Sequence, residues 1–487
     1  MSRWSRQPRG VRAAHISALR RSAQDEATQD NEKRAQILAE RFFPGEGLAD
    51  LRDIDENRQA TSTIDVPTAV TPDEIIKVIK DTLNGRAPGP DGIPNEILKV
   101  IAPEIAEDLA QATSTLLEQG NIPISFKESI TATIRKERKG DYTLPSSYRP
   151  VALENTLAKV IEKVVANRIS DAAEEHNLLP WNQMGGRRKR STLSALDLLT
   201  SSIQTAWSSK RGCVVSMLSL DISGAYDHVL TKRLLWILRN KGFPEWIIKY
   251  VQSFMQGRRT KVAFDGYESN WIQTDAGIPQ GSPISPILFL FFISELLEGV
   301  QDIKESKLGF GFMDDTNLIT WGASAKENCE RLEEAHKRCT DWSRRHGSKF
   351  APDKYKLMHF TRRKRDPRGD LASTVKIEGF AEEIKPETKL RVLGVWMDPK
   401  MNWKEHIKVA IGKGTAAFEA LSRIAASTWG PCMQRSKLLY TAIVRPAMVY
   451  GAQAWYTGPN GKQTKSNLTQ LELIQNKCLR RITGGYK

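Results

Sequence analysis

The chain has 487 residues, enough for two to four structural units. Its 72 Lys and Arg outnumber its 57 Asp and Glu and give a formal net charge of +15. This excess favours a polyanion such as nucleic acid as partner, although a soluble basic protein without such a partner fits the charge equally well. The five cysteines show neither C-x-x-C spacing nor a Cys/His cluster, which argues against a disulfide framework or a zinc finger and for a reducing compartment. The longest apolar run, ISPILFLFFISELL, is too short to cross a bilayer and is typical of a buried helix.

The N-terminal segment is polar and basic. Its first 24 residues hold several Arg and Ser and no acid. Such a composition fits a mitochondrial transit peptide or a basic linker left after a truncated upstream domain, and we prefer the linker. Residues 1–70 are therefore expected to be a basic linker, with one helical stretch around Glu32 to Phe42.

The remaining pattern predicts helices, then a mixed sheet, then helices again. In chain order the elements are a capped helix from Thr71 to Asn84, helices to Gly120, a hairpin over 130–153, a helix over 155–176, a buried strand over 213–221, helices to Gln256, and two strands flanking Asp265-Gly266. There follow the loop DAGIPQGSPISP, the apolar helix, the hairpin 309–321, a helix with Leu332, Ala335, Cys339 and Trp342 on one face, the strands YKLMHFT, TVKIEGF and LRVLGVWMD, and helices from Lys404 broken by Pro431 and Pro446. This order indicates an α+β fold with a central antiparallel sheet.

Two adjacent acids, Asp314 and Asp315, lie between apolar runs in GFGFMDDTNLITW. An isolated pair of this kind fits a turn, since Asp is a frequent turn residue. A metal site would need a further carboxylate, and Asp221 supplies one at the end of the apolar run CVVSMLSLD. If the two segments pair, three carboxylates converge. Their mutual repulsion would require cations, and two Mg²⁺ ions at such a site can promote phosphoryl transfer.

The ordered set LDISGAYD, GIPQGSPISPILF and FMDD resembles the palm of a reverse transcriptase. It is most similar to the type encoded by non-LTR (LINE-like) retrotransposons, including the fungal ones, over roughly residues 85–487. The resemblance implies a right-hand polymerase fold. Many relatives also carry an endonuclease and a ribonuclease H domain, and we expect both to be missing here. The implied parts are fingers at 71–212, a palm at 213–400 that includes the primer-grip hairpin, a truncated helical thumb at 401–487, and a reverse transcriptase domain at about 130–400.

The resemblance also implies roles for residues around the acids. Asp221, Asp314 and Asp315 match the catalytic carboxylates that bind two Mg²⁺ ions, or Mn²⁺ in their place, and the backbone carbonyl of Ile222 matches a further metal ligand. Lys354 matches the general acid that protonates pyrophosphate, with a plain surface lysine as the alternative.

A second group of residues matches the nucleotide pocket. Tyr226 corresponds to the aromatic residue that excludes a ribose 2′-hydroxyl, and Gln280 and Gly281 to the centre of the loop that touches template and nucleotide. Arg149 and, less closely, Lys136 correspond to cations near the triphosphate, although either fits an ordinary surface charge.

A third group matches contacts to nucleic acid. Its members are Gly277 and Pro279 in the same loop, Arg187 and Arg190 in QMGGRRKRST, and Leu393 and Gly394 in the primer-grip hairpin. The basic run of QMGGRRKRST also fits a solvated face or a nuclear import signal. The run RRKRDPRGD, residues 362–370, is expected to be an exposed loop.

Together these features predict an RNA-directed DNA polymerase that uses an RNA template, a DNA primer and dNTPs, with no membrane contact; they indicate no oligomeric state. The alternatives are an RNA-dependent RNA polymerase, which Ala225 and Tyr226 disfavour, and an inactive nucleic-acid-binding remnant of a retroelement. A group II intron maturase would need a C-terminal region that we do not see. The nucleus is the expected compartment, with a cytoplasmic ribonucleoprotein stage, and the Arg-rich start leaves the mitochondrion as an alternative.

Overall fold

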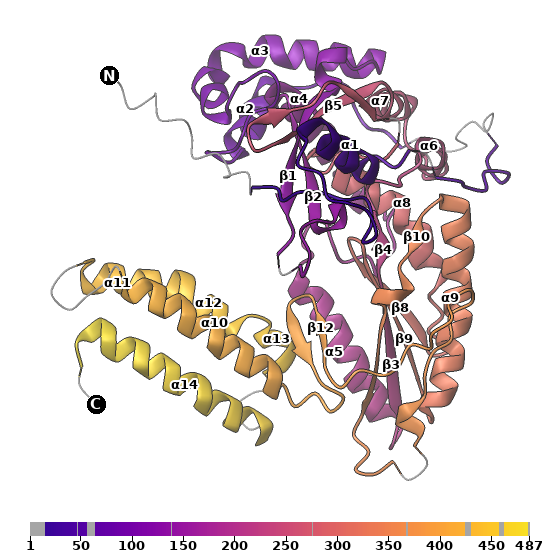
Figure 1. The fold of residues 1–487 in the computed structure, drawn as a ribbon, viewed down its shortest axis with the longest axis vertical. Helices are drawn as coiled ribbons and strands as arrows, with labels where there is room; N and C mark the ends of the chain where they lie inside the picture. Colours follow the sequence, from indigo (N-terminus) through magenta and orange to yellow (C-terminus); the bar gives the residue numbers. More distant parts are fainter. Residues whose placement is uncertain are drawn as a thin grey trace. The chain divides into compact units, whose positions relative to one another are not determined.

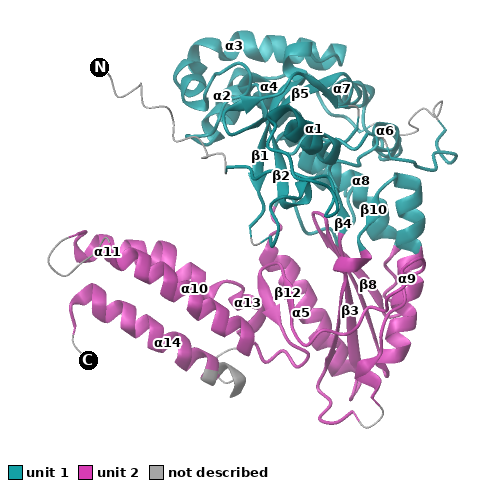
Figure 2. Cartoon of the chain, in the orientation of Figure 1, with its two compact units in different colours: residues 1–188, 222–299, 338–351 teal, residues 189–221, 300–337, 352–487 magenta. Residues whose placement is uncertain are grey.

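The fold was obtained as a computed structural model (Figure 1). It describes residues 15–45, 47–55, 64–137, 139–274, 276–366, 369–423, 430–456 and 462–485. The transit-peptide or linker prediction thus lies outside the described residues for positions 1–14 and 56–63. Two compact units are each assembled from three stretches of chain, residues 1–188, 222–299 and 338–351 in unit 1 and residues 189–221, 300–337 and 352–487 in unit 2 (Figure 2). They do not follow the predicted fingers, palm and thumb boundaries, which stay a prediction.

Unit 1 combines a five-stranded sheet with helices. Its helices are α1 (Asn31–Phe42), α2 (Pro72–Asp81), α3 (Asn95–Gln119), η2 (Ile124–Lys127), η3 (Pro145–Ser147), α4 (Thr156–Glu175), α6 (Thr231–Asn240), α7 (Glu245–Met255), α8 (Ser285–Gly299) and the C-terminal part of α9 (Ala325–His346). Its strands are β1 (Glu128–Arg135), β2 (Tyr148–Glu154), β4 (Ile222–Ser223), β5 (Arg258–Phe264), β6 (Tyr267–Glu268), β7 (Ile272–Thr274) and β10 (Lys349–Phe350). The sheet has the order β2-β1-β5-β6, with β7 also on β5, and β4 pairs separately with β10.

Local sequence explains several helix ends in unit 1. The hydroxyl of Thr71 accepts a hydrogen bond from the backbone N–H of Glu74 at 3.2 Å, which confirms the predicted cap of α2. Helix α3 ends where Gly120 adopts a left-handed conformation with φ of 65°. Helix α8 is apolar on all sides and almost wholly buried, as expected for a core helix.

The N-terminal segment corrects one prediction. Residues 15–45 are not a free linker, because Ile16, Leu38 and Phe42 are buried against Phe264 of β5 in one hydrophobic cluster. The backbone N–H of Ile16 also donates to both carboxylate oxygens of Asp265. Apolar side chains spaced along a polar segment therefore complete the core of unit 1.

Unit 2 contains the central antiparallel sheet and most of the C-terminal helices. Its strands are β3 (Val214–Leu220), β8 (Lys307–Phe312), β9 (Asp315–Gly322), β11 (Lys356–Thr361), β12 (Leu390–Val392) and β13 (Val395–Met397). Its helices are α5 (Thr192–Ser209), the N-terminal part of α9, η4 (Pro352–Lys354), η5 (Asp370–Ala372), α10 (Lys404–Ser422), α11 (Met433–Leu439), the π-helical turn η6 (Tyr440–Val444), α12 (Arg445–Val449), α13 (Ala452–Trp455) and α14 (Lys462–Thr483).

The central sheet has the order β11-β3-β9-β8, and every neighbouring pair is antiparallel (Figure 1). Strand β3 is buried along nearly its whole length, and α5 packs against it. In β8 and β9 the core side chains include Leu308, Phe310 and Leu318. The predicted strand 213–221 and hairpin 309–321 are thus confirmed as neighbours in one sheet.

Two details of the C-terminal half differ from the predictions. TVKIEGF forms no strand, since only Val375 pairs, in a single bridge with Ile384. Pro446 does not break the helical run, because Val444 and Arg445 before it are both helical and the π-helical turn η6 leads directly into α12. Most of RRKRDPRGD is an exposed loop as predicted, with residues 367 and 368 outside the described part.

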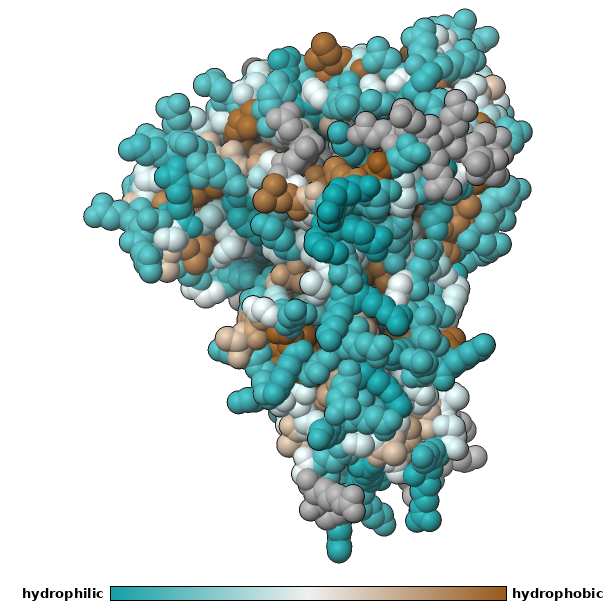
Figure 3. All heavy atoms as spheres, turned by 90° about the vertical axis from the view of Figure 1, so that its right-hand side faces the viewer, coloured by the Kyte–Doolittle hydropathy of each residue, from teal (hydrophilic) through white to brown (hydrophobic). Residues whose placement is uncertain are grey.

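One face of the molecule is mainly polar. Figure 3 shows one face covered largely by hydrophilic side chains, with hydrophobic atoms in small separate groups. Among the described residues, no helix is long and apolar enough to span a bilayer.

Candidate active site

The three predicted carboxylates lie at one end of the central sheet in unit 2. Strand β3 pairs with β9 up to Leu220 opposite Thr316, so one further step brings Asp221 beside Asp315. Asp315 in turn pairs with Phe312 of β8, which leaves Met313 and Asp314 as the two-residue turn of the hairpin. The register of the sheet therefore brings together acids that are more than 90 residues apart in sequence.

The hairpin turn has a strained backbone. Met313 has φ of 57°, in the left-handed region that an unbranched, bulky side chain seldom occupies. Buried side chains of β8 and β9, Phe310 and Leu318 among them, hold both strands in place. Such strain persists where the surrounding packing fixes the backbone, and it is frequent at functional sites.

Charge repulsion is evident among the acids. The pKa of Asp315 is raised to about 6, first by loss of hydration and then by the negative charges of Asp314 and Asp221. The residue still reaches solvent, so screening by water limits the effect. A carboxylate cluster of this kind is stabilised by a nearby cation.

A lysine side chain supplies positive charge next to these acids. Lys354 ends the short helix η4, two residues before β11 begins beside β3. Its Nζ donates to Oδ2 of Asp221 at 2.8 Å, and both side chains are partly exposed. Of the residues predicted to act with the acids, Lys354 is thus in direct contact with one of them.

The donor set suits Mg²⁺, since carboxylate oxygens are its preferred protein ligands. The described residues contain no group of three His, Cys, Asp or Glu side chains arranged closely enough to hold an ion as they stand. The pKa of Asp315 is raised by loss of hydration and by the neighbouring negative charges, and the Lys354 ammonium balances part of that charge at Asp221. On that chemistry the residues fit a divalent cation.

The predicted nucleotide loop lies in unit 1, where it is fixed to two neighbouring segments. The backbone N–H of Ala152 in β2 donates to the carbonyl of Gln280 at 2.7 Å, and that of Ile278 donates to the carbonyl of Tyr226 at 2.9 Å. Gly281 has φ of 136°, and a Cβ there would lie 2.5 Å from the Ala152 carbonyl oxygen. Only glycine fits this approach of two backbones.

Two side chains complete the loop. Gln280 Nε2 donates to Oδ1 of Asp227 at 2.9 Å. Burial raises the pKa of Asp227, while Gln280 and the charges of Arg41 and Lys136 lower it in part. The ring of Tyr226 stacks on Phe289 of α8 at 4.9 Å between centroids. Sequence reasoning missed Asp227, because no local pattern links it to an amide 53 residues further on.

The predicted phosphate-binding cations of unit 1 differ in their surroundings. Arg149 is an exposed residue of β2, opposite Ile134. Lys136 donates through Nζ to the Ser146 carbonyl at 2.9 Å and so helps to close the hairpin. Arg149 is therefore the more accessible of the two, and Ile222 is buried in β4 next to Asp221 in the chain.

The residues predicted to contact nucleic acid also differ in their surroundings. Arg187 is buried, and its guanidinium donates to both carboxylate oxygens of Glu174 and to the carbonyls of Leu179 and Pro180. It thus ties two segments of unit 1 together, and its template contact stays an untested prediction. Arg190 is half-buried just before α5. Gly277 and Pro279 lie in the loop held by Tyr226 and Ala152.

The predicted primer-grip hairpin is present as β12 and β13. Leu393 and Gly394 form its turn, with φ of 46° and 87°. The hydroxyl of Tyr450 donates to the Leu393 carbonyl at 2.7 Å and so holds the turn. Tyr450 was not singled out from the sequence, since its partner is 57 residues away.

Two acids at the turn of an antiparallel hairpin lie beside a third acid that follows the next strand, as the resemblance to reverse transcriptases predicted. The profile described as "Reverse transcriptase (RNA-dependent DNA polymerase)" matches residues 134–397. The chain belongs to this reverse transcriptase family.

Several relatives extend the similarity beyond that domain. The chain is 27% identical over 458 residues to the "Probable RNA-directed DNA polymerase from transposon X-element" of Drosophila melanogaster, covering 92% of this chain and 48% of the relative. It is 27% identical over 465 residues to the "RNA-directed DNA polymerase from mobile element jockey" of the same species, with the same shares covered. The chain therefore spans about half the length of these curated relatives.

Among solved structures, apo telomerase from Candida tropicalis, truncated from its C-terminal domain, aligns with a TM-score of 0.40 and 12% identity. The alignment covers 63% of this chain and 59% of the telomerase.

Proposed function

We propose that this chain is an RNA-directed DNA polymerase of retrotransposon origin that joins dNTPs to the 3′-hydroxyl of a DNA primer on an RNA template. The observation that carries the proposal is the grouping of Asp221, Asp314 and Asp315 at one end of the central sheet of a reverse transcriptase family member. The printed names of the relatives, RNA-directed DNA polymerases of mobile elements, support it.

The three carboxylates would hold two Mg²⁺ ions, or Mn²⁺ in their place, with the Ile222 carbonyl as a further ligand. When bound, such ions supply the positive charge that activates an attacking oxygen and stabilises a leaving one. Lys354 would donate its proton to the departing pyrophosphate, since its ammonium already lies at Asp221.

The loop of unit 1 would position the incoming nucleotide. Gln280 and Gly281 would line the nucleotide site and Tyr226 would bar a ribose 2′-hydroxyl, because its ring is fixed by stacking on Phe289. Arg149, and less directly Lys136, would pair with the triphosphate.

Further residues of the chain would hold the nucleic acid. Gly277 and Pro279 would touch the template, Arg190 would meet its backbone, and Leu393 and Gly394 would support the primer end. The net charge of +15 supports a polyanionic partner. We place the enzyme in the nucleus, where a retroelement polymerase meets chromosomal DNA, and its fungal origin stays a prediction from the sequence.

Primer extension on an RNA template with dNTPs and Mg²⁺ tests this function. Wild-type chain should extend the primer, and Asp314→Asn should reduce extension to background, because the amide keeps the size of the carboxylate and removes its charge. Asp353→Asn is the matched control, since Asp353 is an exposed aspartate of η4 next to Lys354. It should extend like the wild type.

Three outcomes would contradict the proposal. Equal loss in both variants would mean that Asp314 has no special role. A preference for rNTPs over dNTPs would instead indicate an RNA-dependent RNA polymerase. Salt-sensitive RNA binding without any incorporation would indicate an inactive remnant.

A further inference from the structure

Unit 2 has a cavity at the opposite end of the central sheet from the carboxylates. The indole N–H of Trp207 on α5 donates to the carbonyl of Phe360 at 3.4 Å, and Phe360 pairs with Val215 near the start of β3. Asp221 follows the other end of that strand. At about 3.3 Å per residue, roughly 20 Å of strand separates the two places. The cavity is therefore separate from the acids.

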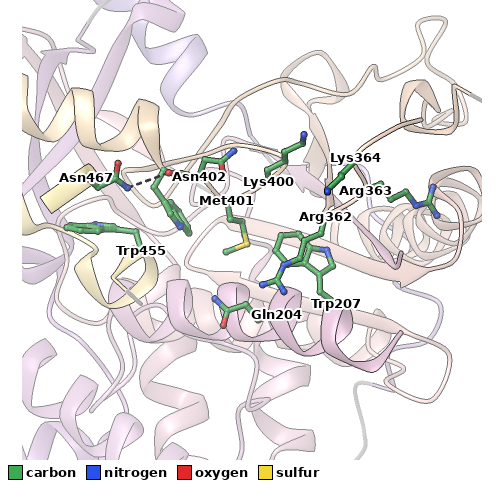
Figure 4. Close-up of a pocket in the computed structure, with 11 residues that line it drawn as sticks. Gln204, Trp207, Arg362, Arg363, Lys364, Lys400, Met401, Asn402, Trp455 and Asn467 are labelled. Carbon is green, nitrogen blue, oxygen red and sulfur yellow. Dashed lines mark hydrogen bonds between the residues drawn. The ribbon is translucent and has the colours of Figure 1, made fainter. Parts of the chain in front are cut away.

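The cavity is large enough for a small organic ligand. Its volume is about 370 Å³. Its lining comes from five separate segments, namely α5, the loop after β11, the loop after β13, α13 and α14 (Figure 4). A site that is assembled from so many segments cannot be recognised from any one stretch of sequence.

Aromatic and apolar side chains form its inner surface. Trp207, Trp403 and Trp455 line it together with Met401, and all four are buried. The indole N–H of Trp455 donates to the Tyr450 carbonyl at 3.2 Å, which fixes that ring. The inner wall is thus rigid and suited to a flat apolar group.

Its rim is basic. Arg362, Arg363, Lys364 and Lys400 line the cavity, whereas the described lining residues include no acid. Arg363 is engaged, because it donates to Asp370 and to the carbonyl of Gly212, and Figure 4 shows it turned away from the other side chains. Lys364 and Lys400 are exposed. The positive charge at this rim faces solvent.

Arg362 belongs to the basic rim and also contacts the aromatic inner wall. Its guanidinium lies 4.7 Å from the centre of the Trp207 ring, and Figure 4 shows the two side chains overlapping. The residue is exposed, so the outer face of the guanidinium is open to a ligand. Unpaired bases commonly stack on guanidinium planes of this kind.

We propose that this pocket binds an unpaired nucleotide of a single-stranded nucleic acid, with its base stacked on Arg362 and its phosphate held by Lys364 and Lys400. A flat cationic surface next to apolar walls suits a base of any identity, and two flexible ammonium groups suit a phosphate. The binding would depend little on sequence and strongly on salt. It does not depend on the polymerase reaction.

The test measures the Kd of a fluorescein-labelled 12-nucleotide oligouridine for the full chain. Binding is monitored by fluorescence anisotropy in a buffer that contains EDTA, at several salt concentrations. K364A/K400A should raise the Kd roughly ten-fold near 0.1 M salt. It should also lower the slope of log Kd against log salt by about 0.7, the value for one phosphate of a single strand that is no longer neutralised.

The matched control is K326A/K337A, which removes two exposed lysines of α9. It should change the Kd less than two-fold, roughly the effect of bulk charge alone. Equal weakening by both double variants would overturn the proposal, because the loss would then reflect net charge and not this pocket.

Three further measurements test the proposal. Arg362→Lys retains the charge and removes the plane, so binding should weaken with an unchanged salt slope, and wild-type binding would contradict the stack. A 4-thiouridine oligonucleotide should crosslink to peptides that contain Trp207 or Met401, and crosslinks found exclusively elsewhere would overturn the site. Competition by 5′-UMP would show that a free nucleotide suffices, whereas no competition would assign the pocket to the polymer.

Discussion

Lys354 and Asp221 form an ion pair across the end of the central sheet, with Nζ 2.8 Å from Oδ2. The lysine comes from η4 before β11 and the aspartate from the end of β3, so the pair exists because these strands are neighbours. It places the one basic side chain proposed to act in catalysis on one of the proposed metal ligands. A divalent cation would have to share the Asp221 carboxylate with that ammonium or displace the ammonium from it. Metal binding is therefore coupled to the position of Lys354.

Replacing Lys354 tests its role as proton donor. Lys354→Ala should lower the maximal rate of primer extension roughly 10²-fold, the usual contribution of a general acid. Lys356→Ala, at the exposed first residue of β11, is the matched control and should keep the wild-type rate. An unchanged rate in Lys354→Ala would show that the lysine is an ordinary surface residue.

Tyr226 should control the choice of sugar. Its ring is held against Phe289, so the space beneath a nucleotide ribose is filled by a rigid aromatic group. Tyr226→Ala should increase the efficiency of rNTP relative to dNTP incorporation by about ten-fold or more, measured as a ratio of kcat/KM. Tyr226→Phe keeps the ring and should discriminate as the wild type does. Equal discrimination in all three proteins would remove this role.

Asp227 should act as a positioning residue through Gln280. Asp227→Ala removes the acceptor for Gln280 Nε2, so the KM for dNTP should rise about ten-fold with a smaller change in kcat. Asp227→Asn can still accept the same hydrogen bond and should restore most of the affinity. If the asparagine variant were as impaired as the alanine variant, the negative charge and not the hydrogen bond would be what matters.

Gly281 should be intolerant of any side chain. A Cβ at this position meets the Ala152 carbonyl at 2.5 Å, and φ of 136° is unfavourable for other residues. Gly281→Ala should lower the free energy of unfolding by about 2–4 kcal/mol, measured by urea denaturation. Gly140→Ala is the control, because no atom lies within 4 Å of the place that its Cβ would take and its φ is not in the left-handed range. A similar loss in both variants would argue against the close approach.

His336 should make stability depend on pH. It is buried in unit 2 with Nε2 2.9 Å from the Tyr355 hydroxyl, and burial lowers its pKa to about 4. Between that value and its ordinary pKa of about 6.5, the unfolded chain binds the proton more readily. This contribution is therefore fully present above pH 6.5 and is lost as the pH falls towards 4, by at most about 3 kcal/mol.

His336→Gln should flatten the stability profile over this range, measured as the free energy of unfolding at several pH values. His176→Gln, at an exposed histidine that follows α4, should leave the profile as in the wild type. Parallel profiles for the wild type and His336→Gln would contradict the assignment.

Local sequence patterns predicted most of the secondary structure. The cap at Thr71, the alternation around Asp314 and the apolar run of α8 are each encoded within a few residues. For this reason the hairpin, its neighbouring strand and the order of helices could be predicted. TVKIEGF failed because alternation alone does not supply a partner strand, and only one bridge forms there.

The sequence by itself determined which residues carry charge, where most of the strands and helices form, and which acids end a buried strand, since these depend on neighbours along the chain. The tertiary structure alone decided that Lys354 meets Asp221, that Gln280 meets Asp227, and that Arg187 is engaged by Glu174. It also brought the basic run after β11 to the tryptophans of α5 and α13. These relationships depend on sheet register and helix packing between distant segments, which no single stretch of sequence specifies.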